Sequence, residues 1–409
     1  MTPGATGAQT FVPPTETGAP EHPLKLLVFG FDAAEAAQIR RMRSYLDCGF
    51  DVTGYMKRRA NMNADFVPFW DNVHLYNTAN ESPARRAAAV AGSVGKLLAH
   101  RDKLAGTDVI VARNLDMLAI AAAAQAMLRP RPPLIYECLD IHDLMSSSGV
   151  KCAALRRGER LILARCASLI VSSPAFVREY FAPVQGGTGP VTLLENKLRL
   201  GDTDPTRPDP APPATEMPET WTAERPLVLG WVGTLRCAPS LALLAAGADR
   251  LGPRVRVALH GIVHSHAVPD FDRIVAARDN MTWYGAYNYP GDLAEIYSDC
   301  DLVWSQDLWQ WGTNSTWLLP NRFYEACYYG CPSRAVAGSE TGVRVAAGLG
   351  WTIPAPEAAA LADLLDRLSP ADVAACRRAL LSRPETDFRQ TREEVAAAIR
   401  LPLGTVPVT

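Results

Sequence analysis

The chain has 409 residues, more than one ordinary hydrophobic core organises, so we expect two domains. Apolar residues make up 48% and charged residues 21%, the balance of a globular protein, and the net charge of -2 gives no field that would gather nucleic acid. The apolar runs stay well short of the roughly 20 residues that cross a bilayer. Nine scattered cysteines form no Cys-x-x-Cys pair, so we expect reduced thiols and no zinc site.

The first half of the chain predicts a doubly wound sheet. Residues 1–22 are rich in Pro, Gly and Thr and lack a secretory signal, which predicts a disordered tail and a cytoplasmic protein. A buried-type strand over 24–29 then leads into a helix over 33–46. Ala/Leu/Arg-rich helical segments alternate with the later strands, which indicates a Rossmann-like domain over 23–200. The later strands are expected at 51–55, 108–112, 134–137, 169–172 and 191–194.

A second series of β-α units follows a proline-rich break in the pattern. Residues 201–226 are crowded with proline and acidic residues, which predicts a linker. The following β-α units indicate a second Rossmann-like domain over 227–385. The final segment, 386–409, predicts a helix over about 386–399 and a tail, and such a helix can cross back to the first lobe. The strands of the second domain are expected at 227–232, 255–260, 281–284, 302–305 and 333–337.

The most informative motif begins at Pro320 and Asn321, which favour the start of a helix, and ends at Gly330, which stops one. The first turn of such a helix offers unpaired N–H groups and a positive dipole end, so it stabilises an anion. Arg322 adds a charge that can fork onto phosphate oxygens, and Glu325 can accept from a pair of ribose hydroxyls. The alternative is an ordinary surface helix.

This motif resembles the PNKFE-x4-G-x-P signature of bacterial glycosyltransferases, close to family 4 and to the glucosyl- and glucuronosyltransferases of exopolysaccharide assembly. The resemblance implies an α/β GT-B architecture, in which two Rossmann-like doubly wound domains face a cleft. It assigns acceptor binding to 23–200 and nucleotide-sugar binding to 227–385. It also implies that Glu325 holds the ribose and that Arg322 approaches the diphosphate. Many retaining relatives carry a glutamate where this chain has Trp317, which favours an inverting enzyme.

A glycine turn directly after the linker supports the donor assignment. Gly233 has no side chain, so phosphates can approach the backbone, and Thr234 and Arg236 can donate hydrogen bonds to them. A tight βα loop without a ligand is the alternative. Trp283 and Tyr284 end a later strand and could stack on a nucleotide base, or simply pack at the sheet edge.

The catalytic base is expected in the first domain. An inverting transfer needs a group that removes the proton of the acceptor hydroxyl, and Asp140 follows a strand where clefts of doubly wound folds form. Asp143 is the nearest competitor, with His142 as an orienting group. The alternative for both aspartates is capping of the next helix. Asp32, in the first βα loop, is a further candidate for the base.

Three basic clusters lie in the first half and suggest contact with an anionic membrane or a lipid diphosphate, although solvated helix faces are the alternative. For a cytoplasmic protein, such clusters suggest a position at the inner face of the cytoplasmic membrane. The clusters are Arg40, Arg41 and Arg43; Lys57, Arg58 and Arg59; and Arg156, Arg157, Arg160 and Arg165.

We therefore predict a hexosyltransferase that moves a sugar from a nucleotide diphosphate sugar, UDP-linked, to a lipid-linked or oligosaccharide acceptor in exopolysaccharide or cell-surface polysaccharide synthesis. No cofactor or metal is expected, because helix dipoles and basic side chains offset the diphosphate charge and no Asp-x-Asp motif is present. The alternatives are a nucleotide-sugar epimerase and a non-catalytic sugar-nucleotide-binding scaffold. A NAD-dependent oxidoreductase is disfavoured, because residues 29–34 lack a Gly-x-Gly-x-x-Gly run.

Overall fold

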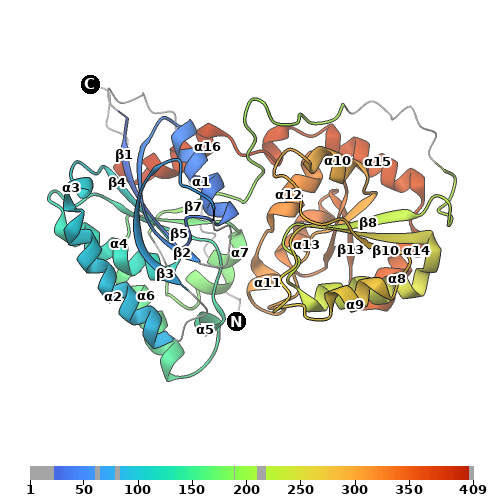
Figure 1. The fold of residues 1–409 in the computed structure, drawn as a ribbon, viewed down its shortest axis with the longest axis horizontal. Coiled ribbons are helices and arrows are strands. Elements are labelled where there is room, and N and C mark those ends of the chain that lie inside the picture. Colours follow the sequence, from blue (N-terminus) through green and yellow to red (C-terminus); the bar gives the residue numbers. More distant parts are fainter. Residues whose placement is uncertain (1–22, 60–64, 79–82, 188, 210–217, 405–409) are drawn as a thin grey trace, which may run out of the picture. The chain divides into compact units, whose positions relative to one another are not determined.

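A computed structural model describes residues 23–59, 65–78, 83–187, 189–209 and 218–404. The predicted tail over 1–22 lies outside these ranges. The described chain divides into two compact units (Figure 1). Unit 1 runs up to Glu195 and takes in the chain again from Thr391, and unit 2 spans Asn196–Gln390.

Unit 1 is built on a parallel sheet with the strand order β3-β2-β1-β4-β5-β6-β7. The order reverses between β1 and β4, as in doubly wound folds. The central strands are buried, apart from Lys25 at the start of β1, because helices cover both faces, which explains their continuous apolar sequences. The strands are β1 (Lys25–Gly30), β2 (Asp51–Arg59), β3 (Asp71–Thr78), β4 (Val109–Arg113), β5 (Leu134–Cys138), β6 (Ser168–Val171) and β7 (Val191–Leu193).

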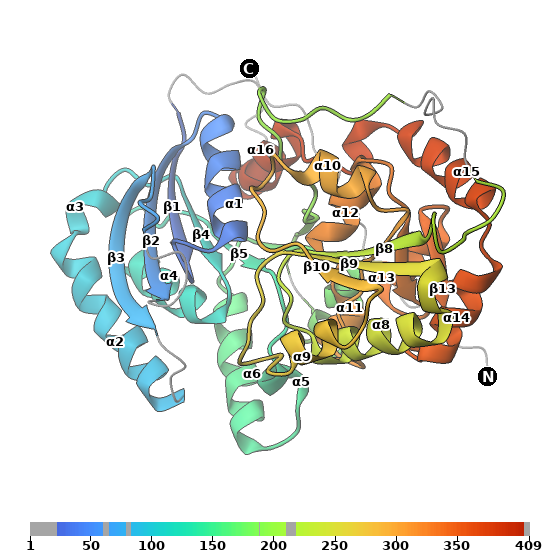
Figure 2. The same cartoon turned by 45° about the vertical axis from the view of Figure 1, so that its right-hand side comes forward.

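The helices of unit 1 lie on the two faces of this sheet (Figures 1 and 2). α1 begins at Ala36, later than predicted, because the Glu35 side chain caps it by accepting from the backbone of Gln38. The helical segments are α1 (Ala36–Asp47), α2 (Pro83–Ala99), α3 (Arg101–Leu104), α4 (Leu115–Met127), α5 (Asp143–Ser146), α6 (Val150–Leu163), α7 (Pro174–Phe176), η1 (Val177–Phe181), α16 (Arg392–Arg400) and η4 (Leu401–Leu403).

The last long helix, α16, belongs to unit 1, so the chain does return to its first half. A capping box of Thr391 and Glu394 fixes the start of α16, which is later than the predicted 386. Its apolar face, including Val395 and Ile399, packs in the same core as residues of α1 and β1. Burial of this face ties the C-terminal segment to the first unit.

Unit 2 repeats the architecture with the strand order β10-β9-β8-β11-β12-β13, again all parallel. α8 and α14 cover one face of this sheet and α10 and α12 the other (Figure 2). A separate apolar core lies under each pair of helices. The strands are β8 (Leu227–Val232), β9 (Val255–His260), β10 (Met281–Trp283), β11 (Leu302–Trp304), β12 (Ser333–Val336) and β13 (Gly350–Ile353). The helical segments are α8 (Ala238–Leu251), η2 (Gly252–Arg254), α9 (Phe271–Ala276), α10 (Leu293–Ser298), α11 (Asn314–Trp317), α12 (Asn321–Tyr328), α13 (Glu340–Ala346), α14 (Ala358–Arg367), α15 (Pro370–Leu381) and η3 (Glu385–Asp387).

The predicted linker, 201–226, is packed against unit 2 where it is described. The Arg207 guanidinium donates to the carbonyl oxygens of Tyr328, Leu380 and Arg383. The Trp221 side chain is 7% exposed and packs in a core of unit 2. Proline prevents regular structure here, but these two side chains still anchor the segment, so the boundary between the units lies at Glu195 rather than at residue 200.

Within the described ranges, no helix is both long enough and apolar enough to cross a bilayer.

Candidate functional site

Two glycine turns meet at the carboxyl edge of the unit 2 sheet. Gly233 follows β8 with a φ of 112°, and Gly261 follows β9 with a φ of 129°. The Gly233 amide donates to the carbonyl of His260 at 2.9 Å, and a Cβ built on Gly261 would lie 1.7 Å from the Gly233 oxygen. Only glycine fits at Gly261, so the two turns are locked together and leave the backbone of the Gly233 turn open to a ligand.

The structure brings Arg322 to the Gly233 turn. α12 begins at Asn321 after the Pro320 cap, as predicted, and Arg322 lies in its first turn. A Cβ built on Gly233 would lie 3.9 Å from Arg322 Nη2. Thr234 and Arg236 are exposed on the same turn. The arrangement combines a helix N-terminus, an open backbone and a guanidinium, which together suit an anionic group.

Glu325 lies one turn further along α12 and is 5% exposed. The buried Tyr297 hydroxyl, on α10, donates to Glu325 Oε2 at 3.2 Å. Burial raises the pKa of Tyr297 well above its ordinary value, so the phenol keeps its proton and acts as a donor. The sequence gives no signal for this role of Tyr297, because an aromatic residue on an amphipathic helix is indistinguishable from a core residue.

Both members of the predicted aromatic pair are partly exposed, Trp283 to 43% and Tyr284 to 50%, but among the described residues only Trp283 has its polar atom bonded within the sheet edge. Trp283 donates its indole N–H to the Gly261 carbonyl at 3.0 Å and packs edge-on against Phe271, which favours a structural role. The Tyr284 ring lies 4.6 Å from the His260 ring with an interplanar angle of 4°, and Tyr284 is 50% exposed. Burial lowers the pKa of His260, so the stacked imidazole is neutral. A ring backed in this way can stack a further planar group on its open side.

The segment after β5 places Asp140 in an exposed position at the carboxyl edge of the unit 1 sheet. The Ser172 hydroxyl donates to the Leu139 carbonyl at 3.4 Å, which attaches this segment to the end of β6. The side chain that caps α5 is that of His142, whose Nδ1 accepts from the backbone of Leu144, so the N-cap position belongs to His142 rather than to either aspartate. Asp143 is exposed as the first residue of α5.

Asp32 occupies a different environment. Its side chain is fully buried, and Oδ1 accepts from the backbone amides of Ala34 at 3.1 Å and Arg59 at 3.5 Å. Burial raises the pKa of this carboxyl, against the opposing effect of those two amides. These bonds connect the first βα loop to the end of β2, a positional role that the sequence did not predict.

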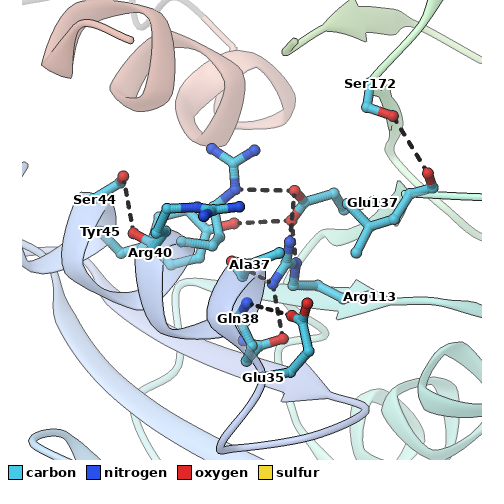
Figure 3. Close-up of polar contacts among 11 residues, drawn as sticks. Glu35, Ala37, Gln38, Arg40, Ser44, Tyr45, Arg113, Glu137 and Ser172 are labelled. Atoms are coloured by element: carbon cyan, nitrogen blue, oxygen red, sulfur yellow. Dashed lines mark hydrogen bonds and ion pairs between the residues drawn. The ribbon is translucent and has the colours of Figure 1, made fainter. Parts of the chain in front are cut away.

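A buried ion-pair network surrounds Glu137, near the end of β5 and three residues before Asp140 (Figure 3). Glu137, at the end of β5 and 1% exposed, accepts from Arg41 Nε and Arg113 Nε at 2.9 Å each and from the Tyr45 hydroxyl at 3.3 Å. Arg113 also donates to Gln38 Oε1 at 2.8 Å. Burial alone would raise the pKa of Glu137, but the two guanidinium charges outweigh it and hold the pKa below its ordinary value.

This network corrects part of the predicted basic surface. Arg41 is 5% exposed and paired with Glu137, so it does not face solvent. Lys57 is 8% exposed and its ammonium lies 3.3 Å from an Asp116 oxygen. Because Arg41 and Lys57 pair with carboxylates inside unit 1, two of the three basic clusters present less positive charge to solvent than the sequence predicts.

Within the described ranges, His, Cys, Asp and Glu side chains do not come together in any group of three or more that could hold a metal ion.

The tandem parallel sheets are those of the GT-B fold, which confirms the predicted fold class. Sucrose-phosphate synthase from Thermosynechococcus elongatus matches with a TM-score of 0.66 and 14% identity, over 93% of this chain and 98% of the other. Anabaena HepE, solved in complex with UDP and glucose, matches with a TM-score of 0.60 and 16% identity, over 92% and 98%. WaaG, a glycosyltransferase involved in lipopolysaccharide biosynthesis, matches with a TM-score of 0.57 and 16% identity, over 93% and 100%.

The sequence comparison identifies the family. The chain is 36% identical over 348 residues to the succinoglycan biosynthesis protein ExoL of Rhizobium meliloti strain 1021, and the match covers 85% of each protein. The protein belongs to the ExoL family. No protein-family model matches the chain. The match to ExoL and the GT-B structures together confirm the resemblance to GT-B proteins of exopolysaccharide assembly.

Proposed function

We propose that this protein is a hexosyltransferase that moves a sugar from a UDP-linked donor to a lipid-linked or oligosaccharide acceptor in exopolysaccharide synthesis. The observation that carries the proposal is the approach of Arg322 to the open Gly233 turn, with Glu325 one helical turn away. Two named relatives support it, since one is a succinoglycan biosynthesis protein and another was solved with UDP and glucose. Neither the epimerase nor the silent scaffold is favoured.

The donor's parts correspond to the residues of unit 2. The diphosphate binds at the Gly233 turn, where Thr234, Arg236 and Arg322 supply donors and two positive charges. Asn321 contributes the first backbone amide of α12, and the helix dipole adds to the attraction. Glu325 accepts from the ribose hydroxyls. These charges offset the diphosphate, so we propose that transfer needs no metal ion, and activity is expected to survive EDTA.

In unit 1 we propose Asp140 as the base. Its carboxylate takes the proton of the acceptor hydroxyl while the hydroxyl oxygen bonds to the anomeric carbon and the bond from that carbon to the diphosphate breaks. The nucleoside diphosphate leaves with the electron pair, and the anomeric configuration inverts. Asp140 is preferred because it is exposed at a sheet edge, whereas Asp32 is fully buried. Asp143, also exposed, is the second candidate.

The test of transfer uses the purified protein, radiolabelled UDP-sugars and membrane lipid extract. Label entering the lipid fraction is the expected result. Conversion of the donor to a different free sugar without any lipid would instead indicate an epimerase, and binding without turnover would indicate a scaffold. Asp140→Asn is expected to abolish transfer and to leave UDP binding unchanged. An active Asp140→Asn variant would promote Asp143.

We further propose peripheral contact with an anionic membrane through α6, which presents basic and apolar side chains together. Two arginines of the basic cluster Arg156, Arg157, Arg160 and Arg165 also donate hydrogen bonds within unit 1. Arg156 donates to the carbonyls of Met145 and Ser147, and Arg160 donates to that of Val184. The exposed basic residues are Lys151, Arg157 and Arg160 on α6 and Arg165 just after it, and the exposed apolar residues are Val150, Leu155 and Leu161.

Vesicle flotation tests this contact. The protein is expected to float with phosphatidylglycerol-containing vesicles and not with phosphatidylcholine alone. Each basic residue near an anionic surface contributes roughly 1 kcal/mol of binding free energy. The double variant Lys151→Glu and Arg157→Glu is expected to stay at the bottom of the gradient. Equal flotation of variant and wild type would rule out α6 as the contact.

A further inference from the structure

The segment that joins β11 to α12 exposes two large apolar side chains while it buries a smaller one. Trp309 is 50% exposed and Trp311 is 39% exposed, whereas Leu308, beside them in sequence, is 5% exposed and packs in a core of unit 2. Tryptophan gains more than leucine from burial, so packing alone would favour the opposite arrangement. The exposure of both tryptophans therefore favours a role in binding a ligand over a role in packing.

The backbone that carries the two tryptophans is fixed by its own polar side chains. Asp307 Oδ1 accepts from the amide of Trp309 at 2.8 Å, and Ser315 Oγ accepts from the amide of Gln310 at 2.9 Å. Thr316 Oγ1 accepts from the amide of Gly312 at 2.8 Å. A preorganised segment loses little conformational entropy when a ligand settles on it, which is the property of a binding surface.

The same segment is attached to the proposed diphosphate site within unit 2. The Leu308 amide contacts Cys237 Sγ at 3.3 Å, and Cys237 directly follows Arg236 on the Gly233 turn. On the other side, the Ser339 hydroxyl, which caps α13, donates to Gln306 Oε1 at 2.8 Å. The tryptophans are thus carried by a segment anchored beside the turn that would hold the phosphates.

We propose that Trp309 and Trp311 form a stacking platform for the pyranose ring of the nucleotide-sugar donor. The sugar is bonded to the outer phosphate. When the diphosphate binds at the Gly233 turn, the pyranose therefore lies next to that turn, near the segment that carries the two tryptophans. One face of a pyranose carries axial C–H groups, which pack against the face of an aromatic ring while the hydroxyls stay hydrated. This inference rests on the proposed function and adds the group that distinguishes a UDP-sugar from UDP.

Calorimetric titration tests the platform by comparing UDP with UDP-glucose, UDP-galactose, UDP-N-acetylglucosamine and UDP-glucuronic acid. For the sugar nucleotide that binds wild type most tightly, Trp309→Ala and Trp311→Ala are each expected to weaken binding about tenfold, while UDP binding stays within about twofold. Trp309→Phe, which keeps an aromatic face, is expected to restore most of the loss. Phe69→Ala, which truncates a 43% exposed aromatic residue in unit 1, is the matched control and is expected to change neither affinity.

Three results would overturn the platform. Equal weakening of UDP and of the UDP-sugar would show that the tryptophans act on the nucleotide or on local folding. Unchanged affinities with lost transfer would assign them to the acceptor, and unchanged affinities with full transfer would leave them without a role in catalysis. A wild-type protein that binds none of these nucleotides would instead refute the proposed function itself, and the platform with it.

Discussion

Replacement of Glu137 by glutamine measures how strongly the buried network of unit 1 holds the end of β5. Glu137 is 1% exposed and is the shared partner of Arg41 and Arg113, which are 5% and 1% exposed. A neutral amide leaves two buried guanidinium groups without this counter-charge. Its NH2 group is a hydrogen-bond donor and would face the N–H donors of the guanidinium groups. Removal of one partner from a buried ion pair costs about 3–5 kcal/mol, so we expect a loss of that size in the free energy of unfolding of unit 1.

Hydrogen exchange followed by mass spectrometry is the suitable assay, because β5 peptides report on unit 1 even if the two units unfold separately. Glu179→Gln is the control: Glu179 pairs with Arg178 on the surface, with 41% and 59% of the side chains exposed, and its loss is expected to cost less than about 1 kcal/mol. A cost below about 1 kcal/mol for Glu137→Gln as well would refute the reasoning.

The pKa of Glu137 gives a second readout. Because the folded-state pKa lies below the unfolded value near 4.5, the charged carboxylate contributes stability that is fully present above that pH. This contribution is lost as the pH falls through the folded-state pKa. The acid limb of the stability curve is therefore expected to be shallower in Glu137→Gln than in wild type, and superimposable limbs would contradict the assignment.

The remaining predictions concern the substrates. Glu325→Ala is expected to weaken UDP binding by about tenfold to a hundredfold, since two hydrogen bonds to a charged group are lost, as measured by calorimetry. Tyr297→Phe, which removes one donor to that carboxylate, is expected to weaken UDP about fivefold without changing the rate at saturating donor; a lower rate with unchanged affinity would argue against positioning. Arg322→Lys is expected to bind UDP more weakly than wild type because an ammonium cannot fork onto two oxygens, and equal affinity would exclude bidentate contact. Asp140→Asn is expected to lower transfer at least about a hundredfold with donor binding intact, whereas Asp143→Asn is expected to stay active in the same radiolabel assay.

Local sequence pattern was sufficient for the elements that carry their own start and stop signals. Pro320 and Gly330 bracket α12 where predicted, and continuous apolar runs located the central strands of both sheets. The strands that sequence missed, β3 and β13, lie at sheet edges. β3 mixes polar and apolar residues and β13 begins at a glycine, so neither carries a continuous apolar run, whereas the edge strands β7 and β10 were predicted.

The candidate donor site was only half determined by sequence. Its residue types follow from the motif, but the approach of Arg322 to Gly233 depends on the order in which β8 and β11 pair. The hydrogen bond from Tyr297 to Glu325 joins residues 28 positions apart. Periodicity reports which face of an element is apolar, not which distant side chain that face will meet.

The sequence by itself determined the two doubly wound sheets and the chemistry of the motif, because glycine, proline and apolar period act over a few residues. Tertiary structure decided which charges remain available. Arg41, 96 positions from Glu137, looked like a surface cation and became one side of a buried ion pair. Likewise, the unit boundary and the return of α16 to unit 1 follow from side chains that find their cores far along the chain, and such pairing is set by packing rather than by neighbours in sequence.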